Sequence, residues 1–185
     1  STGRLSNLHQ VKNKIKFINV DVSSSKNSID KYFKNVDWVF HLAGIADIIP
    51  SITNPEDYFQ TNVKGTLNIL GASKKANIKK LIYAASASCY GIPDKYPTNE
   101  KSKTNPQYPY ALTKFLGEQL IIHWADVYKM SNISLRFFNA YGPRSRTTGV
   151  YGAVFGVFLA QKFAKKPLTI VGNGRQTRDF IHIYD

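Results

Sequence analysis

The chain has 185 residues, of which 43% are hydrophobic, so it is long enough for one globular domain with a sizeable core and too apolar for a disordered segment. Its single cysteine, Cys89, excludes an internal disulfide and a multi-cysteine metal site, and without a run of transmembrane length or a signal-peptide pattern the expected location is the cytoplasm. The formal net charge is +13, but the lysines are scattered, which indicates no specific nucleic-acid site and fits anionic small molecules equally well.

Strand-like and helix-like segments alternate along the whole chain. Apolar runs rich in β-branched and aromatic residues predict strands at 15–20, 38–43, 80–85, 133–138 and 168–171. Helical spacing of apolar residues predicts helices at 28–33, 55–76, 110–128 and 151–164. Pro55 stands near the first turn of its helix, and a Pro-rich loop precedes the helix at 110.

This alternation predicts an α/β fold, a Rossmann-type doubly wound parallel sheet with helices on both faces. In such sheets, ligands bind in the crevice outside the carboxyl ends of the strands. Residues of polar or turn-forming type follow four of the predicted strands: Asp21, Ala43–Gly44, Ser86 and Asn139. Turn chemistry alone also favours such residues, but their convergence on one edge of the sheet favours a binding site.

Ser86, Tyr110 and Lys114 form the pattern with the most chemical content. Tyr110 and Lys114 lie one helical turn apart, so the ammonium can lie beside the phenol. A nearby cation favours phenolate and is expected to lower a tyrosine pKa that is ordinarily about 10. Ser86 ends an apolar run, where its hydroxyl could hold a substrate oxygen while the tyrosine removes the proton. Because Tyr-x-x-x-Lys also arises by chance, a solvated helix face is the alternative.

Seven short motifs then follow one another along the chain: Ser1-Thr2-Gly3-Arg4, Asp21-Val22, His41-Leu42-Ala43-Gly44, Asn62-Val63-Lys64-Gly65-Thr66, 85–91 with Ser86, 136–143 with Asn139, and 178–182 with Arg178. In this order they resemble the extended short-chain dehydrogenase/reductase proteins that act on nucleotide sugars, the NAD-dependent epimerase/dehydratase family. Each motif is short, but seven in the family's order are specific.

The resemblance implies an NAD cofactor, a UDP-sugar substrate and a homodimer formed through a helix bundle, with no metal and no membrane. The implied catalytic residues are Ser86, Tyr110 and Lys114. The implied cofactor-binding residues are Asp21, Val22, Leu42, Ala43, Gly44, Asn62, Tyr110 and Lys114. The implied substrate-binding residues are Ser86, Ser88, Asn139 and Arg178, the last two at the diphosphate. An ion pair with Asp179 is the alternative for Arg178, and His41 is interpreted as structural.

The family's Gly-x-x-Gly-x-x-Gly loop, which places the cofactor pyrophosphate on a helix N-terminus, is not among these residues. The chain therefore looks like a fragment of a longer protein. We expect residues 1–140 to belong to an NAD-binding domain without its first βαβ portion, and residues 141–185 to begin a substrate-binding lobe. Such a fragment is expected to be inactive by itself.

Ala87 and Ser88 stand where related dehydratases and decarboxylases carry carboxylates. Elimination of water needs an acid and a base beyond the tyrosine. The expected reaction is therefore epimerisation of a UDP-hexose at C4, through oxidation to a 4-keto intermediate and re-reduction. The alternatives are another nucleotide-sugar reaction (4,6-dehydration, reduction or decarboxylation) and a non-catalytic relative that binds NAD or RNA.

Overall fold

The computed structural model describes residues 3–24, 29–145, 154–170 and 172–185. The chain divides into two compact units. Residues 21–138 form one, called here the sheet unit, and residues 1–20 with 139–185 form the other, called the terminal unit. The expected division into domains 1–140 and 141–185 stays a prediction.

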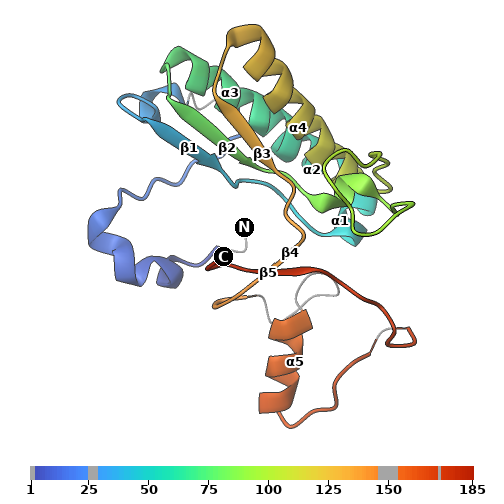
Figure 1. Ribbon diagram of the computed structural model, residues 1–185. Helices are drawn as coiled ribbons and strands as arrows, with labels where there is room; N and C mark the ends of the chain where they lie inside the picture. Colours follow the sequence, from blue (N-terminus) through green and yellow to red (C-terminus); the bar gives the residue numbers. More distant parts are fainter. Residues whose placement is uncertain (1–2, 25–28, 146–153, 171) are drawn as a thin grey trace. The chain divides into compact units, whose positions relative to one another are not determined.

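The sheet unit is built on three parallel strands in the order β1-β2-β3 (Figure 1). These are β1 (Trp38–His41), β2 (Lys80–Ala84) and β3 (Asn132–Leu135). Leu81 of β2 pairs with Val39 on one side and with Asn132 on the other. Because both pairings are parallel, the carboxyl ends of all three strands lie at one edge of the sheet. Parallel neighbours also require a crossover connection between them. The predicted parallel α/β architecture is confirmed.

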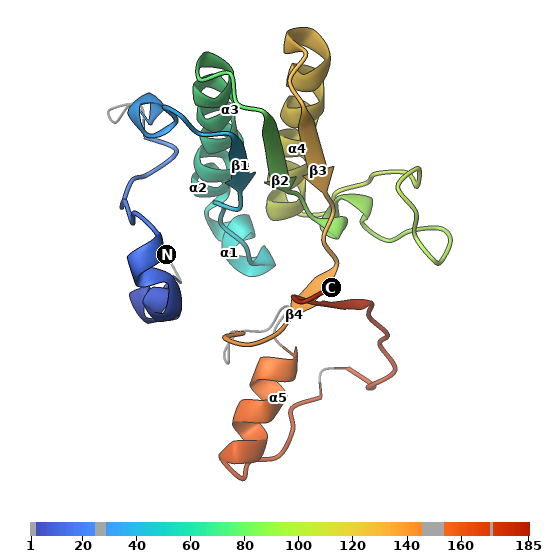
Figure 2. The same cartoon turned by 60° about the vertical axis from the view of Figure 1, so that its left-hand side comes forward.

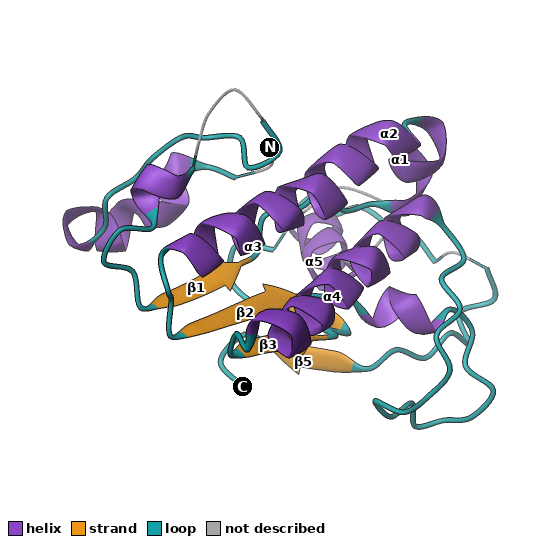
Figure 3. Ribbon diagram, turned by 90° about the horizontal axis from the view of Figure 1, so that it is seen from above, coloured by secondary structure: helices purple, strands orange, loops and turns teal. Residues whose placement is uncertain are grey.

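Two long helical segments form the crossovers and pack on the same face of the sheet (Figure 3). The first comprises α2 (Pro55–Tyr58), a π-helical segment (Phe59–Lys64) and α3 (Gly65–Lys75), and the second is α4 (Pro109–Tyr128). A proline opens each segment, where its missing N–H costs no helical hydrogen bond. Shorter elements are α1 (Ile48–Thr53) and the 3₁₀ turns Asp30–Tyr32 and Ala87–Tyr90. None of the described helices is long and apolar enough to cross a membrane.

The core lies between these helices and the sheet. Leu70 of α3, Leu81 and Tyr83 of β2, and Ile121 of α4 are almost completely buried. Gly117 lets α4 approach β2 closely, because the Tyr83 hydroxyl occupies the position where a side chain at residue 117 would begin. On the opposite face the described residues leave large apolar side chains exposed: Trp38, Phe40, Ile133 and Leu135.

The terminal unit contains a 3₁₀ helix (Leu5–Lys14), β4 (Asn139–Tyr141), α5 (Val154–Phe163) and β5 (Phe180–His182). β4 and β5 pair in parallel. The Tyr141 ring centroid lies 4.6 Å from that of Phe155 and 5.0 Å from that of His182. This aromatic cluster joins α5 to both strands.

Several predicted strands differ from the structure. Residues 15–20 form no strand, because no described strand pairs with them and an unpaired strand is not stable; Asp21 therefore does not follow a strand. Residues 168–170 also form none, since Gln161 bonds both the backbone N (3.1 Å) and the hydroxyl (2.8 Å) of Thr169. Residue 171 lies outside the described residues. The strand predicted at 133–138 ends at Leu135, and Asn139 begins β4.

The predicted helices agree with the structure more closely than the predicted strands do. The segments predicted at 55–76 and 110–128 are helical at 55–75 and 109–128. The helix predicted at 28–33 is a single 3₁₀ turn at 30–32, and residue 28 lies outside the described residues. The helix predicted at 151–164 is described from Val154 to Phe163, with 151–153 outside the described residues.

Candidate active site

Ser86 and Tyr110 meet at the carboxyl edge of the sheet, where β2 ends. Ser86 is the N-cap of the turn Ala87–Tyr90, and Tyr110 lies in the first turn of α4. Burial is the largest influence on the pKa of Tyr110 and raises it; a hydrogen bond with Ser86 lowers it, and the charge of Asp47 raises it. The net shift is upward. The expected lowering by Lys114 is therefore wrong for the protein alone, because loss of hydration dominates at this half-buried phenol.

Ser88 is the hydrogen-bond partner of Ser86 within the turn. The Ser86 and Ser88 Oγ atoms lie 2.7 Å apart, and the Ser88 N–H donates to Ser86 Oγ over 3.2 Å. The two bonds fix the Ser86 hydroxyl at the start of the turn, where it also lowers the pKa of the nearby Tyr110 against the larger effect of burial.

Lys114 is a buried cation one helical turn after Tyr110 on α4. It is 7% exposed, and its Nζ lies 4.4 Å from the centroid of the Tyr83 ring. Among the described residues it has no carboxylate partner and no hydrogen-bond acceptor. Burial lowers the pKa of Lys114 to about 8. A buried ammonium without an acceptor is poised to bind one from a ligand.

Asn62 fixes the loop that follows β1. Its Oδ1 accepts from the Ile45 N–H at 2.8 Å, and its Nδ2 donates to the Ile45 carbonyl and to Thr113 Oγ1, each at 3.1 Å. A side chain at Gly44 would meet Asn62 Oδ1 at 3.0 Å. The buried Asn62 amide thus holds this loop close to α4. The predicted cofactor residues of this loop, Leu42, Ala43 and Gly44, are exposed.

His41 lies beneath the same loop and has a packing role. Thr66 Oγ1 donates its proton to the Asn62 carbonyl at 2.6 Å. In the 2.9 Å hydrogen bond between His41 Nε2 and Thr66 Oγ1, His41 must therefore be the donor. Burial, with a smaller contribution from the charge of Lys114, lowers the pKa of His41 to about 4. A neutral His41 thereby ties β1 to α3.

Asp47 is a site residue that the sequence analysis missed. Its charge acts on Tyr110, and its neighbour Ala46 accepts a hydrogen bond from Tyr58 Oη at 2.8 Å. The Tyr58 ring in turn meets the Tyr110 ring edge-on, with centroids 6.4 Å apart. Figure 2 shows α1, which Asp47 precedes, at the carboxyl ends of β1 and β2. Its place three residues after Gly44, in a strand-end loop, was the available signal.

The pair Asp21-Val22 is held against α3. Asp21 Oδ1 accepts from the N–H and the hydroxyl of Ser23 at 2.8 and 2.7 Å, and these bonds lower the pKa of Asp21. The Val22 carbonyl accepts from Asn68 Nδ2 at 2.8 Å. A side chain at Gly65 would meet Val22 Cγ2 at 3.0 Å. The Asn-x-x-Gly-Thr motif therefore positions both the loop after β1 and this segment.

Glu118 and Arg136 join α4 to the segment after β3. The Arg136 guanidinium makes a forked contact with the carboxylate, with Nη2 at 2.6 Å and Nε at 2.9 Å from its oxygens. The guanidinium carbon also lies 4.7 Å from the centroid of the Tyr90 ring. Tyr90 ends the turn that begins after Ser86. This ion pair therefore helps to fix the serine turn relative to the tyrosine helix.

The remaining predicted site residues, Asn139 and Arg178, belong to the terminal unit. Asn139 Nδ2 donates to the Asp179 carbonyl at 2.8 Å, which supports the pairing of β4 with β5. Arg178 is exposed, and its Nη1 donates to the Thr177 carbonyl at 2.8 Å. Their assignment to a diphosphate stays a prediction.

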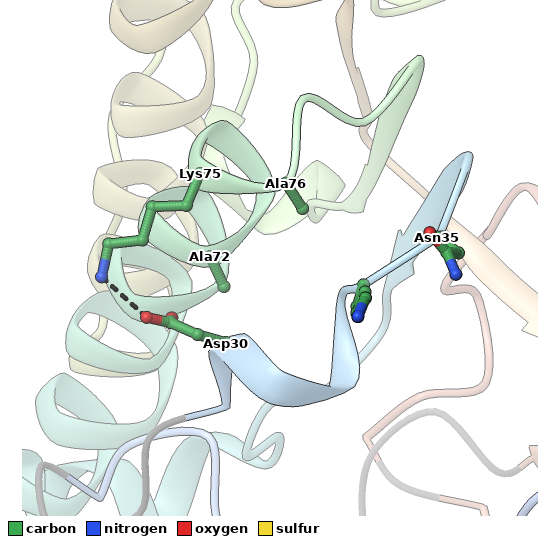
Figure 4. A pocket seen from close by; sticks show the side chains of 6 residues that line it. Asp30, Asn35, Ala72, Lys75 and Ala76 are labelled. Carbon is green, nitrogen blue, oxygen red and sulfur yellow. Dashed lines mark hydrogen bonds and ion pairs between the residues drawn. The ribbon is translucent and has the colours of Figure 1, made fainter.

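A pocket between the turn Asp30–Tyr32 and the end of α3 contains none of these residues (Figure 4). Ala72, Ala76 and Asn35 line it, and Lys75 crosses it to form an ion pair with Asp30 at 2.7 Å. Both partners of this pair are largely solvated, so the contact adds little stability.

Lys114→Met should stabilise the ligand-free protein and abolish turnover. At pH 7 we expect a gain of about 1–2 kcal/mol in unfolding free energy, since the cost of burying the ammonium exceeds its contact with Tyr83. Raising the pH through the folded pKa of about 8 should shrink the gain, because there the unfolded chain binds the proton that the folded chain has released. Urea unfolding of the full-length protein at pH 7 and pH 10 measures both.

Lys74→Met is the matched control for this variant. Lys74 is an exposed lysine whose Nζ lies 3.6 Å from the centroid of the Tyr128 ring. It should show no gain in stability and no loss of turnover. A Lys114→Met protein that is less stable than wild type at pH 7 would contradict the interpretation of Lys114 as a buried cation that destabilises the ligand-free protein and binds a ligand.

Comparison with known proteins extends these observations. The model of the NAD dependent epimerase/dehydratase family matches residues 2–185. A UDP-glucose 4-epimerase of Mycolicibacterium smegmatis is 32% identical, over 100% of this chain and 60% of its own length. The structure of a UDP-N-acetylglucosamine 4-epimerase from Methanobrevibacter ruminantium M1, in complex with UDP-N-acetylmuramic acid, has a TM-score of 0.93 at 32% identity, over 98% of this chain and 58% of that one.

A UDP-glucuronic acid 4-epimerase from Bacillus cereus, in complex with UDP-glucuronic acid and NAD, has a TM-score of 0.84 at 30% identity, over 97% of this chain and 56% of that one. The chain thus spans about 60% of the length of the Mycolicibacterium and Methanobrevibacter relatives and a little less of the Bacillus one. Because the family model covers nearly all of it, the chain belongs to the NAD dependent epimerase/dehydratase family.

Proposed function

We propose that the full-length protein interconverts UDP-hexoses with their C4 epimers and uses a tightly held NAD without net consumption. The observation that carries the proposal is the approach of Ser86 to Tyr110 at the carboxyl end of β2, with the buried ammonium of Lys114 one turn further along α4. The turn beside them has Ala87 and Ser88 where an eliminating enzyme would need carboxylates. The names of the relatives, which include 4-epimerases of UDP-glucose and UDP-glucuronate, support the same reaction class.

The residues present fit an NAD cofactor. Lys114 is a buried donor without an acceptor among the described residues, and a ribose hydroxyl is a suitable acceptor. The loop of Leu42, Ala43 and Gly44 is exposed beside it, and the absence of a side chain at Gly44 leaves its backbone open to close approach. We propose that Lys114 holds the nicotinamide ribose, while Asp21 and Val22 contact the adenine.

In the proposed reaction, Tyr110 removes the proton of the sugar 4-hydroxyl and later returns it. Ser86 holds the C4 oxygen in both states, and Ser88, whose Oγ lies 2.7 Å from that of Ser86, helps to orient the Ser86 hydroxyl. NAD⁺, when bound, supplies the hydride acceptor and a positive charge that favours phenolate over phenol. The chain's own contribution is therefore the position of two hydroxyls and the placement of charge.

The finer features of the assembly are proposals as well. Asn139 and Arg178 would bind the substrate diphosphate, a role that the exposed guanidinium of Arg178 supports. A second copy of the chain would pack on α4, where Leu112, Ile122 and Val127 are exposed. The proposed site of action is the cytoplasm.

Incubation of the full-length protein with UDP-glucose and with UDP-N-acetylglucosamine, followed by separation of the products, tests the proposal. We expect the C4 epimer of one or both sugars, without added cofactor. A 4-keto-6-deoxy sugar would show a dehydratase instead. Carbon dioxide released from a UDP-hexuronate would show a decarboxylase.

A further inference from the structure

Two side chains, Asn62 and Tyr58, hold residues 45 and 46 against α4, the helix that carries Tyr110; together they are called here the clamp. Asn62 bonds Ile45 at both its N–H and its carbonyl, and also bonds Thr113 of α4. Tyr58 bonds the Ala46 carbonyl and meets the Tyr110 ring. Asp47 follows directly, and the helix that it opens packs against α4. Asp47 thus belongs to a segment that is fixed next to Tyr110.

The backbone of Asp47 is strained. Its φ of 94° lies in a region that side-chain-bearing residues seldom adopt, at a cost of about 1–3 kcal/mol. It opens α1, yet its carboxylate makes no capping bond to that helix. Strain of this kind persists where the surroundings enforce it, and it clusters at ligand sites. The backbone conformation of Asp47 is therefore enforced by its surroundings, which include the bonds of Asn62 and Tyr58 to the two preceding residues.

A fixed negative charge here distinguishes two classes of nucleotide sugar. A hexose carries a neutral hydroxymethyl group at C5, whereas a hexuronate carries a carboxylate at the same carbon. This group is two bonds from C4, so it stays close to the reacting centre whichever face of C4 is presented. Like charges held close together in a partly desolvated site repel strongly. The known relatives include enzymes named for each class.

We infer that Asp47 makes this site select UDP-hexoses with a neutral C6 group and reject UDP-hexuronates. The inference rests on the proposed epimerase function and names its substrate class. It requires that the charge of Asp47 is felt at the place where the sugar C4 oxygen binds, beside Tyr110. The effect of Asp47 on Tyr110 supports this, since its charge raises the pKa of that phenol.

Among the described residues, the titratable side chains on the elements around Tyr110 include Tyr58 from α2, Tyr83 from β2, His41 from β1 and Lys114 from α4. The influence of Lys114 is felt at His41, whereas none is found at Tyr110. His41 is neutral near pH 7, since its pKa lies at about 4. The charge that acts on Tyr110 is that of Asp47.

The test compares UDP-glucose with UDP-glucuronate in full-length wild type and in Asp47→Asn. Asparagine keeps the shape and tolerates positive φ, so the clamp should survive. We expect wild type to prefer UDP-glucose by at least about ten-fold in kcat/KM, and Asp47→Asn to reduce that preference by about ten-fold or more. Asp57→Asn, an exposed carboxylate on α2, is the matched control and should keep the wild-type preference.

A second readout separates charge from shape. Removal of the negative charge makes phenolate easier to form, so the rising limb of the pH profile for UDP-glucose should move to lower pH in Asp47→Asn. Equal use of both sugars by wild type, or an unchanged preference in Asp47→Asn, would overturn the inference.

If the protein epimerises neither sugar, the proposed function fails, and calorimetric binding still decides the inference. Wild type should then bind UDP-glucose at least about ten-fold more tightly than UDP-glucuronate, with the difference reduced in Asp47→Asn. Equal affinities would overturn it.

Discussion

Tyr110→Phe should lower kcat by about 10²–10⁴-fold while the dissociation constant for UDP-glucose stays nearly unchanged. The lost hydroxyl is the proposed base, and removal of a general base typically costs that much. Its proton transfer occurs in the transition state, so ground-state binding suffers little. Initial rates of epimer formation and calorimetric titration of the full-length protein measure the two quantities.

Tyr108→Phe is the matched control for this variant. Tyr108 precedes the first turn of the same helix and is 41% exposed, so it should retain normal turnover. Near-normal turnover of Tyr110→Phe would remove Tyr110 from the role of base. A large loss of UDP-glucose affinity in the same variant would instead indicate a binding residue.

Arg136→Met should destabilise the protein by about 3–5 kcal/mol, because it leaves Glu118 as an unpaired buried charge. Glu118 is 2% exposed and Arg136 is 19% exposed. The double variant Glu118→Leu/Arg136→Met should recover much of the loss, since buried ion pairs can often be replaced by apolar residues without a large cost. Urea unfolding of the full-length protein, analysed with a common slope, gives the differences in free energy.

Lys75→Met provides the comparison with a solvated ion pair. Its single contact with Asp30 is similarly short, at 2.7 Å, but the two side chains are 71% and 41% exposed. We expect a change of less than about 1 kcal/mol. If Arg136→Met were as mild as Lys75→Met, the ion pair with Glu118 would not be a structural tie between the serine turn and α4.

The sequence predicted the parts of the fold that depend on local periodicity. The helices at 55–75 and 109–128 have clear helical spacing and a proline in the first turn, and both are found where expected. The strand expected at 15–20 failed for a different reason. Its residues favour extended backbone, but a strand exists only with a neighbour to bond, and pairing is not visible in one segment of sequence. The same holds for residues 168–170, where Gln161 takes the backbone N–H of Thr169.

The sequence indicated which residue types gather at the sheet edge, whereas their electrostatics depend on packing; their catalytic and binding roles stay predictions. The spacing of Ser86, Tyr110 and Lys114 indicated their meeting, and the contact of Ser86 with Tyr110 follows that expectation. The expected pull of Lys114 on the Tyr110 pKa failed, because depth of burial and the direction of the Nζ toward Tyr83 depend on packing. Asp47 could not be recognised for the same reason, since its approach to Tyr110 depends on the clamp formed by Tyr58 and Asn62.

The central claim, oxidation and re-reduction at C4 of a UDP-hexose, is tested most directly with deuterium at that carbon. UDP-glucose labelled with deuterium at C4 is incubated with the full-length protein in ordinary water, and both epimers are recovered and analysed by NMR and mass spectrometry. We predict that the label stays on C4 in both epimers, because the hydrogen that leaves C4 returns to it without exchange. No solvent hydrogen should enter at C5 or C6. Loss of the label from C4 to water, or a product that has gained solvent hydrogen at C6, would contradict the account.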